Sequence, residues 1–333
     1  MKLVLYPEVG AGRLAKIRDA AGAMRVANCS SEFDATGEIE DADAFFGKLT
    51  PGMLSAARRL RWVQSPTASL EHYIFPELAA YPLQLTNMRG LFYDNIADHV
   101  FGCMLCFARN LHVYIHQQAR AEWKPHGGVK EGQSFRSGPA VATAVDLAHT
   151  TLAGATLGVV GLGSIGGEVA RRGVCFGMRV IAVDSDRTDA PPGVEPPLGP
   201  DRLDDLLSES DYVVIAAPHT PETEGLFDAE KFARMKPSAV LINIGRGVIV
   251  KLDDLTRALE AGQIAGASLD VYEIEPLPPD HPLWAFDNVI LTPHVAGHSP
   301  AIAGRHLAVL VENIGRFVRG EPLANVVDKQ RWF

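Results

Sequence analysis

Short runs of apolar residues alternate with amphipathic segments along the first hundred residues. The apolar runs have the length and composition of buried strands, and stretches between them, such as MLSAARRL, have helical spacing. The expected strands cover residues 2–6, 44–49, 61–65 and 83–87. Strands that alternate with helices in this way predict a parallel sheet.

A second series of strands begins after residue 151. These runs are almost continuously apolar, and helical stretches such as KLDDLTRALEAG separate them. The expected strands cover residues 156–161, 179–184, 212–216, 239–243, 267–270 and 288–292. Near-continuous apolar strands spaced by helices are typical of a doubly wound parallel sheet with helices on both faces.

Between the two series, the pattern predicts one long helix over about 95–121, followed by an irregular segment over 123–139. That segment, WKPHGGVKEGQSFRSGP, is rich in glycine and proline. A long irregular stretch inside a compact domain is uncommon, so we expect it to be the passage between two domains, with a flap or a subunit-contact arm as further roles. A chain of 333 residues is long enough for two domains.

Composition and charge narrow the classes of partner and compartment. The chain is 47% hydrophobic and 21% charged, which is ordinary for a globular protein, and its net charge is −9. An acidic chain argues against nucleic acid or an anionic membrane as the main partner, although it leaves room for a small anionic substrate. The first apolar run stops at Pro7, no run reaches the length of a membrane helix, and four cysteines make no disulfide framework. We therefore expect a cytoplasmic protein.

A glycine-rich turn, GLGSIG, follows the strand expected at 156–161 and precedes a helix. Gly161 permits a tight turn, Gly163 lets the backbone approach a pyrophosphate, and Gly166 lets helix and strand pack closely. The N–H groups that begin the helix would then bind the phosphates. The spacing alone is a weak signal, but the strand before it and the helix after it are the required context.

Asp184 ends the next strand of this unit. Its carboxylate can accept hydrogen bonds from both hydroxyls of an adenosine ribose and would repel a 2′-phosphate, which favours NAD over NADP. Arg187, three residues later, keeps NADP open as the cofactor. The alternative interpretation is a structural turn that binds nothing.

Three ionisable groups follow the carboxyl ends of later strands, where open α/β sheets bind ligands. Arg246 lies in NIGRG, Glu275 in LDVYEIEP and His294 in LTPHVAG. A guanidinium binds a carboxylate in a bidentate way, and an imidazole can give a proton to a developing alkoxide or remove one in the reverse direction. Taken singly, each is more often an ion-paired or packed side chain than a catalytic one.

Five motifs in order carry a resemblance over essentially the whole chain. They are GLGSIG with Asp184, PHTPET (218–223), LINIGRG (241–247), GASLDVYEIEPLPPDHPLW (266–284) and NVILTPHVAG (288–297). With these motifs the sequence resembles the D-isomer-specific 2-hydroxyacid dehydrogenase family. The resemblance implies two flavodoxin-like, Rossmann-like domains with doubly wound parallel sheets, an active site in the interdomain cleft, and hydride transfer between NAD(H) and a small 2-keto acid or D-2-hydroxy acid.

By the same resemblance, Arg246 anchors the substrate carboxylate, His294 is the acid/base, and Glu275 is the partner of His294. No metal is implied. The residues implied in cofactor binding are Gly161, Gly163, Ser164, Ile165, Gly166, Asp184, Pro218, Ile244, Gly245, Asp270 and Gly297. Among them, Asp270 would hold the nicotinamide carboxamide through its side chain.

The resemblance also implies a discontinuous substrate domain, residues 1–120 plus 295–333, around an NAD-binding domain over 121–294, and a homodimer. Substrate binding is expected at the backbone of Ala68, Ser69 and Leu70. Relatives often have a glycine in this turn, and Ser69 stands near its position, so the shape of the turn is the chief departure.

Two other functions stay open at this point. The same fold serves a co-repressor that senses NAD and binds partner peptides, and fold alone does not decide function. A dehydrogenase of a phosphorylated hydroxy acid would need extra basic residues, for which Arg61 and Arg89 are candidates. We interpret Cys103 and Cys106 as packing residues of a helix.

Overall fold

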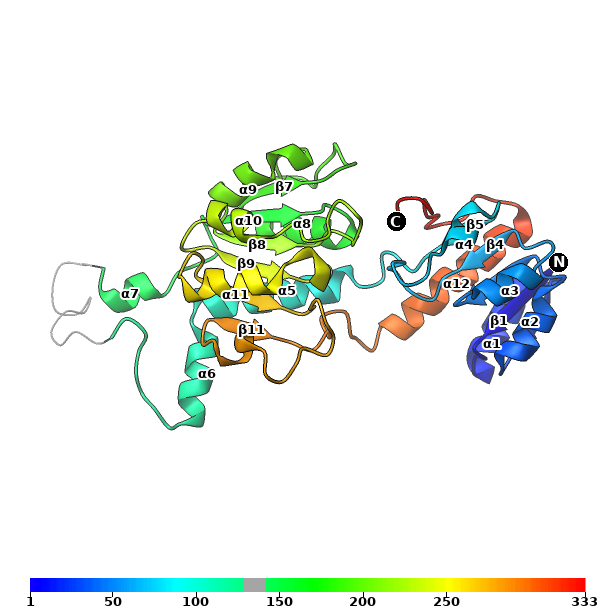
Figure 1. Ribbon diagram of the computed structural model, residues 1–333, viewed down its shortest axis with the longest axis horizontal. Coiled ribbons are helices and arrows are strands. Elements are labelled where there is room, and N and C mark those ends of the chain that lie inside the picture. Colours follow the sequence, from blue (N-terminus) through cyan, green and yellow to red (C-terminus); the bar gives the residue numbers. More distant parts are fainter. Residues whose placement is uncertain (129–141, 333) are drawn as a thin grey trace. The chain divides into compact units, whose positions relative to one another are not determined.

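The computed structural model describes residues 1–128 and 142–332, and the chain forms two compact units (Figure 1). Unit 1 comprises Met1–Phe92 and Ser299–Phe333, and unit 2 comprises Tyr93–His298. Among the described residues, the search for a helix both long and apolar enough to cross a membrane finds none.

Unit 1 is built on a five-stranded parallel sheet in the order β2-β1-β3-β4-β5. Its strands are β1 (Lys2–Tyr6), β2 (Arg25–Asn28), β3 (Ala44–Gly47), β4 (Trp62–Gln64) and β5 (Gln84–Thr86). Its helices are α1 (Ala11–Ala21), α2 (Glu32–Ile39), α3 (Pro51–Ala56), α4 (Pro76–Ala80) and α12 (Ile302–Arg319). Alternate strand residues face opposite sides, so Phe45 and Val63 enter one apolar cluster and Phe46 and Trp62 enter another.

Unit 2 is built on a six-stranded parallel sheet in the order β11-β10-β9-β8-β6-β7. Its strands are β6 (Thr156–Val160), β7 (Arg179–Val183), β8 (Tyr212–Ile215), β9 (Val240–Asn243), β10 (Gly266–Leu269) and β11 (Val289–Leu291). The chain passes from β6 to β7 on one side and returns to β8 on the other. The boundary between β6 and β8 is therefore the switch point at which such sheets bind ligands.

The helices of unit 2 are α5 (Tyr93–Ala108), α6 (Leu111–Ala119), α7 (Ala144–Ala148), α8 (Ser164–Cys175), α9 (Leu203–Glu209), α10 (Ala229–Arg234) and α11 (Leu252–Glu260), with the short turns η1 (Pro200–Arg202), η2 (Gly247–Ile249) and η3 (Pro282–Ala285). Helices α9, α10 and α11 place Leu206, Phe232 and Leu255 in one core cluster, and α5 packs against α8. The predicted fold class, α/β with two doubly wound parallel sheets, is confirmed.

Three sequence-based expectations differ from the structure. The edge strand β2 was missed because its sequence, RVAN, begins with an exposed arginine and contains one strongly apolar residue. The long helix predicted over 95–121 is two helices, since Asn110 adopts a left-handed conformation (φ 54°) between α5 and α6. Asparagine tolerates that conformation without a glycine or proline to signal it.

The units also divide the chain at residue 92 rather than at 120, because α5 packs against α8 of the nucleotide-binding fold. The segment over 123–139 consequently lies within unit 2, and the connections between units fall at 92–93 and 298–299. Most of that segment, residues 129–139, lies outside the described residues.

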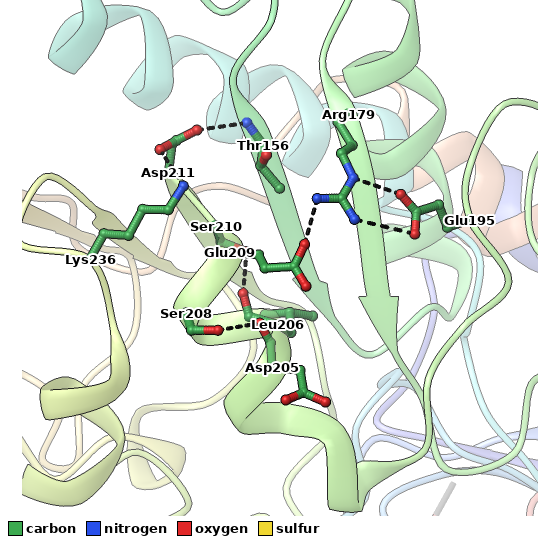
Figure 2. A network of polar contacts seen from close by, with 10 residues as sticks. All are labelled: Thr156, Arg179, Glu195, Asp205, Leu206, Ser208, Glu209, Ser210, Asp211 and Lys236. Carbon is green, nitrogen blue, oxygen red and sulfur yellow. Dashed lines mark hydrogen bonds and ion pairs between the residues drawn. The ribbon is translucent and has the colours of Figure 1, made fainter.

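The amino ends of the unit 2 strands carry a network of polar contacts, which Figure 2 shows. The Asp211 carboxylate accepts a hydrogen bond from the backbone N of Thr156 at 2.8 Å and pairs with Lys236 at 2.9 Å. Arg179, the first residue of β7, pairs with Glu195 at 2.7 Å and with Glu209. These contacts close the edge of the sheet opposite to the one that carries the candidate site.

Candidate functional site

The glycine turn lies between β6 and α8, at the switch point of the unit 2 sheet. Gly161 has φ 90°, a left-handed conformation, and a Cβ there would lie 2.8 Å from the backbone of Ala217. A Cβ on Gly166 would lie 1.9 Å from the Gly161 carbonyl oxygen, so helix and strand are in direct contact. A Cβ on Gly163 would meet nothing within 4 Å, so the first turn of α8 opens onto free space. The three glycines therefore fit the roles that a dinucleotide pyrophosphate requires, with Ser164 and Ile165 as the first helical residues.

Asp184 directly follows β7, and backbone N–H groups hold its carboxylate. One oxygen accepts from Leu162 N at 2.6 Å, and the other accepts from Asp186 N and Arg187 N, both at 2.9 Å. A carboxylate offers about four acceptor positions, so one remains for a ribose hydroxyl. The carboxylate is thus fixed beside the glycine turn.

Arg187 also lies beside the turn, but it is already paired. Its Nη1 donates to the Leu162 carbonyl oxygen at 2.8 Å, and its Nη2 pairs with Asp189 at 2.7 Å. The ion pair with Asp189 raises the pKa of the Arg187 guanidinium. A 2′-phosphate would have to compete with Asp189 for this cation.

The other residues predicted at the cofactor lie beyond neighbouring strands of the same edge. Pro218 follows β8 and is exposed, whereas Ile244 and Gly245 follow β9 and are buried. The two loops touch, since Ile244 N donates to Ile215 O at 3.2 Å and a Cβ on Gly245 would lie 2.7 Å from Ala217 O. Gly297 follows β11 and accepts a hydrogen bond from the α5 residue Asn95 at 3.3 Å.

His294 and Glu275 are brought together in the loops that follow β11 and β10. The His294 Nδ1 lies 2.8 Å from Glu275 Oε2, with side chains 51% and 38% exposed, respectively. Glu275 Oε1 accepts from the backbone N of Tyr272 at 3.1 Å, which orients the carboxylate. An ionised carboxylate can only accept, so Nδ1 carries the proton and Nε2 is the nitrogen left for chemistry. Within the described residues, Nε2 makes no hydrogen bond.

The backbone of His294 is strained, and Asp270 holds it. His294 has φ 54°, which is rare for a residue with a side chain. Asp270, 3% exposed, accepts from Thr292 Oγ1 at 2.7 Å, Val295 N at 2.8 Å and Ala296 N at 2.9 Å. Its carboxylate therefore fixes the chain on both sides of His294. The sequence interpretation placed Asp270 at the cofactor and missed this support.

Arg246 follows β9 in extended backbone (φ −141°) and is half-buried. Its Nη1 donates to the Gly245 carbonyl oxygen at 2.6 Å, and its own carbonyl accepts from Asn243 Nδ2 at 3.0 Å. A Cβ on Gly247 would lie 1.8 Å from the Tyr272 carbonyl carbon. The loop that carries Arg246 is therefore packed directly on the loop that leads to Glu275, and Gly247, which sequence reasoning did not single out, permits this contact.

In unit 1, the predicted substrate turn, which we call the carboxylate loop (Thr67–Leu70), follows β4. The Leu70 side chain is 1% exposed and belongs to the core. No residue of the loop has positive φ, so Ser69 needs no glycine conformation. Within the described residues, the N–H groups of Ala68, Ser69 and Leu70 donate no hydrogen bond. Three successive N–H groups are therefore left as donors that an anion could accept.

Other sequence candidates have structural roles. Cys103 is buried in α5, and burial raises its pKa to about 11, so it is an inert packing residue rather than a redox centre. Arg61 pairs with Asp43 and stacks on Phe317 at the amino edge of the unit 1 sheet. Arg89 is exposed beyond β5. No cluster of potential metal ligands occurs in the part of the chain that is described.

Comparison with known proteins gives consistent matches. A family model described as D-isomer specific 2-hydroxyacid dehydrogenase, NAD binding domain, matches residues 101–296. A glyoxylate reductase of Korarchaeum cryptofilum is 34% identical over 88% of this chain and 84% of its own. A D-isomer specific 2-hydroxyacid dehydrogenase of Xanthobacter autotrophicus, solved with NADPH and MES, has a TM-score of 0.82 and 29% identity, covering 100% of this chain and 99% of its own. An NADPH-dependent glyoxylate/hydroxypyruvate reductase of Sinorhizobium meliloti, solved with NADP and sulfate, has a TM-score of 0.79 and 26% identity over 100% and 99% of the two chains.

Proposed function

Because the chain belongs to the D-isomer-specific 2-hydroxyacid dehydrogenase family and is an oxidoreductase acting on CH–OH donors, we propose that it reduces small 2-keto acids to D-2-hydroxy acids with NADH. The observation that carries the proposal is the contact between His294 Nδ1 and Glu275 at 2.8 Å, at the ligand-binding edge of a nucleotide-binding sheet. The names of similar proteins, glyoxylate reductase and glyoxylate/hydroxypyruvate reductase, favour a small substrate.

His294 supplies the proton in this proposal. Glu275 keeps a proton on Nδ1, so the doubly protonated imidazole gives its Nε2 proton to the developing alkoxide and is left neutral. In the reverse direction the neutral imidazole takes the hydroxyl proton at Nε2. The bound cofactor supplies or takes the hydride. A positioned acid/base of this kind is worth about 10²–10⁴ in rate.

In unit 2, Arg246 is the proposed anchor of the substrate carboxylate, and in unit 1 the carboxylate loop is proposed as a source of donors to an anion. The guanidinium offers a planar pair of donors, and the free N–H groups of Ala68, Ser69 and Leu70 offer backbone donors. Backbone N–H groups can bind a carboxylate without a side chain that would occupy part of the space for the substrate. Arg61 is occupied by Asp43, which removes one of the two cations that a phosphorylated substrate would need.

For the cofactor, we infer a preference for NAD(H) with residual use of NADP(H). Asp184 keeps one acceptor position for a ribose hydroxyl, and Arg187, the cation available for a 2′-phosphate, is paired with Asp189. The NADP and NADPH complexes of similar proteins indicate that members of this fold accommodate the phosphate.

We infer a homodimer from the surface of α6 and α7. Helix α6 has no buried residue, and Leu111, Ile115 and Leu147 are 44%, 61% and 73% exposed. Trp123, just beyond α6, is 94% exposed. Large apolar side chains this exposed on α6, on α7 and just beyond α6 favour a protein interface there. Light scattering of the purified protein distinguishes the dimer expected here from a monomer.

The test of function is NADH oxidation with glyoxylate, hydroxypyruvate, pyruvate and bulkier 2-keto acids. We expect turnover with at least one small acid, and lower kcat/KM with bulkier ones. Folded protein that turns over none of them would overturn the proposal. A protein of the co-repressor type would instead bind NADH and a peptide while reducing no keto acid.

A further inference from the structure

The carboxylate loop is held to the body of unit 1 through its carbonyl oxygens. Thr67 O accepts from Met88 N at 3.0 Å, and Ala68 O accepts from Asn87 Nδ2 at 2.7 Å. Because the carbonyls point into the unit and are taken, the N–H groups of the same peptides are left as donors. Whatever fixes these carbonyls therefore also fixes the anion site.

One further carbonyl, at the entrance to the loop, is held by a residue far away in sequence. His306, on α12, places its Nε2 3.0 Å from Pro66 O and its Nδ1 in contact with the Arg13 guanidinium of α1. A guanidinium has only donors, so Nδ1 must accept, and Nε2 carries the hydrogen that Pro66 O accepts. The imidazole is thus neutral, with its hydrogen on Nε2. It connects the Arg13 guanidinium to the carbonyl of Pro66 at the entrance to the carboxylate loop.

The surroundings of His306 keep it neutral. Its ring meets the Phe46 ring of β3 edge-on, with centroids 5.9 Å apart, and Arg13 lies over the same phenyl ring. Burial lowers the pKa of His306, and the Arg13 cation lowers it further. Arg13 is the charged group that faces the imidazole from the elements around it. Within the described residues, the buried Arg13 Nε has no partner, so His306 is the acceptor on which this guanidinium relies.

We propose that His306 and Arg13 are positioning residues that hold the carboxylate loop in its anion-binding conformation, and so set the affinity for the carboxylate of the keto acid. This proposal rests on the proposed function. A proton on His306 would turn Nδ1 into a donor facing Arg13, adding repulsion between two cations. Acid therefore releases the loop.

The test compares His306→Phe, which keeps the ring but loses both hydrogen bonds, with His306→Gln, which keeps one donor and one acceptor. We expect His306→Phe to raise KM for glyoxylate about 3- to 10-fold, with kcat and KM for NADH within twofold. For His306→Gln we expect a KM near the wild-type value, and we expect this variant to lack the rise in KM that the proposal predicts for the wild type at acid pH.

Arg13→Leu should raise the same KM, and combining it with His306→Phe should add little, since His306→Phe already removes the contact between Arg13 and His306. Arg18→Leu, on the exposed face of α1, is the matched control and should change nothing. An unchanged KM in His306→Phe, or equal changes in His306→Phe and His306→Gln, would overturn the proposal.

Hydrogen exchange separates this proposal from the proposed function. Met88 N–H is protected by its bond to Thr67 O, so its exchange should quicken in His306→Phe and stay slow in His306→Gln, whether or not any keto acid is reduced. Unchanged exchange at Met88 contradicts the positioning role. If the wild type reduces no keto acid but Met88 exchange is faster in His306→Phe, the proposed function is refuted and the positioning role of His306 stands.

Discussion

The two edges of the unit 2 sheet have opposite character. At the amino ends of the strands, Asp211 is paired with Lys236 and a backbone N–H, and Arg179 is paired with two glutamates (Figure 2). At the carboxyl ends, the Gly163 turn faces open space and the His294 side chain is 51% exposed, with a strained backbone. Polar groups at the first edge satisfy one another, whereas at the second edge the Nε2 of His294 makes no hydrogen bond within the described residues.

Unit 1 repeats the contrast. Asp43, just before β3, is 2% exposed and accepts from Lys2 N at 2.8 Å and Arg59 at 2.9 Å. At the opposite edge, the carboxylate loop keeps three free N–H groups. In each sheet an ion-paired cluster therefore closes the amino edge, and polar atoms without a hydrogen bond lie at the carboxyl edge, namely the His294 Nε2 in unit 2 and three backbone N–H groups in unit 1. Substitutions at the first edge should affect stability, and substitutions at the second should affect rate.

The largest effect is expected at His294, the proposed acid/base. His294→Asn should lower kcat for keto-acid reduction about 10²- to 10⁴-fold, because no group replaces the proton donor. Asparagine tolerates positive φ, so the unfolding midpoint should stay within a degree or two of the wild type. Steady-state NADH oxidation and thermal unfolding check both statements, and retention of a tenth or more of kcat would contradict the role of His294.

Asp270→Asn should break the support of the same loop. The amide can still accept from two donors, but its NH₂ would face one of the N–H groups of Val295 or Ala296. A displaced His294 should lower kcat about 10- to 100-fold. Comparable kcat in the two proteins would show that the loop keeps its position without the carboxylate.

Asp43→Asn tests the amino edge of unit 1. Burial alone would raise the pKa of Asp43, but hydrogen bonds from Arg59 and Lys2 N lower it below its usual value. Its stabilisation is therefore complete above about pH 4 and is lost as pH falls through the lowered pKa. In denaturant unfolding at pH 7, the free energy of unfolding of the variant should be about 1–3 kcal/mol lower than that of the wild type. This difference between the two proteins should become smaller below about pH 4, and kcat should be unchanged. A change in kcat without a loss of stability would contradict the assignment of a stabilising role to the amino edge.

Asp189→Asn should release the Arg187 guanidinium for a 2′-phosphate. The ratio of kcat/KM for NADPH to that for NADH should rise about two- to five-fold, chiefly through KM. Arg187→Ala should move the ratio in the opposite direction. If both variants leave the ratio unchanged, Arg187 takes no part in cofactor choice.

The smallest effect is expected for Arg179→Met at the amino edge of unit 2. The side chains of this cluster are about half exposed, 49% for Arg179, and exposed ion pairs contribute little. The unfolding midpoint should move slightly and the kinetic constants not at all. A fall in kcat here would mean that the two edges are coupled.

The sequence predicts every strand except β2, and the glycine turn, because buried parallel strands are continuous apolar runs and the turn needs glycine for steric reasons. It also indicates that Arg246, Glu275 and His294 follow strands at one edge. The structure then brings His294 to Glu275 and the Arg246 loop onto Tyr272.

The remainder depends on tertiary contacts that no local pattern records. Asp270 reaches Val295 and Ala296, and His306 reaches Pro66, across long separations in the chain. The break at Asn110 was equally hidden, since asparagine serves both helices and left-handed turns. Sequence periodicity reports which side chains are buried, but not which polar groups satisfy one another.

A crystal structure of the protein with NADH and oxamate, an unreactive analogue of a 2-keto acid, tests the central claim most directly. We predict His294 Nε2 within about 2.6–3.2 Å of the carbonyl oxygen of oxamate, and its carboxylate on the Arg246 guanidinium. Oxamate bound with its carbonyl beyond the reach of His294, or with its carboxylate away from Arg246, would contradict the assignment of this edge as the catalytic site.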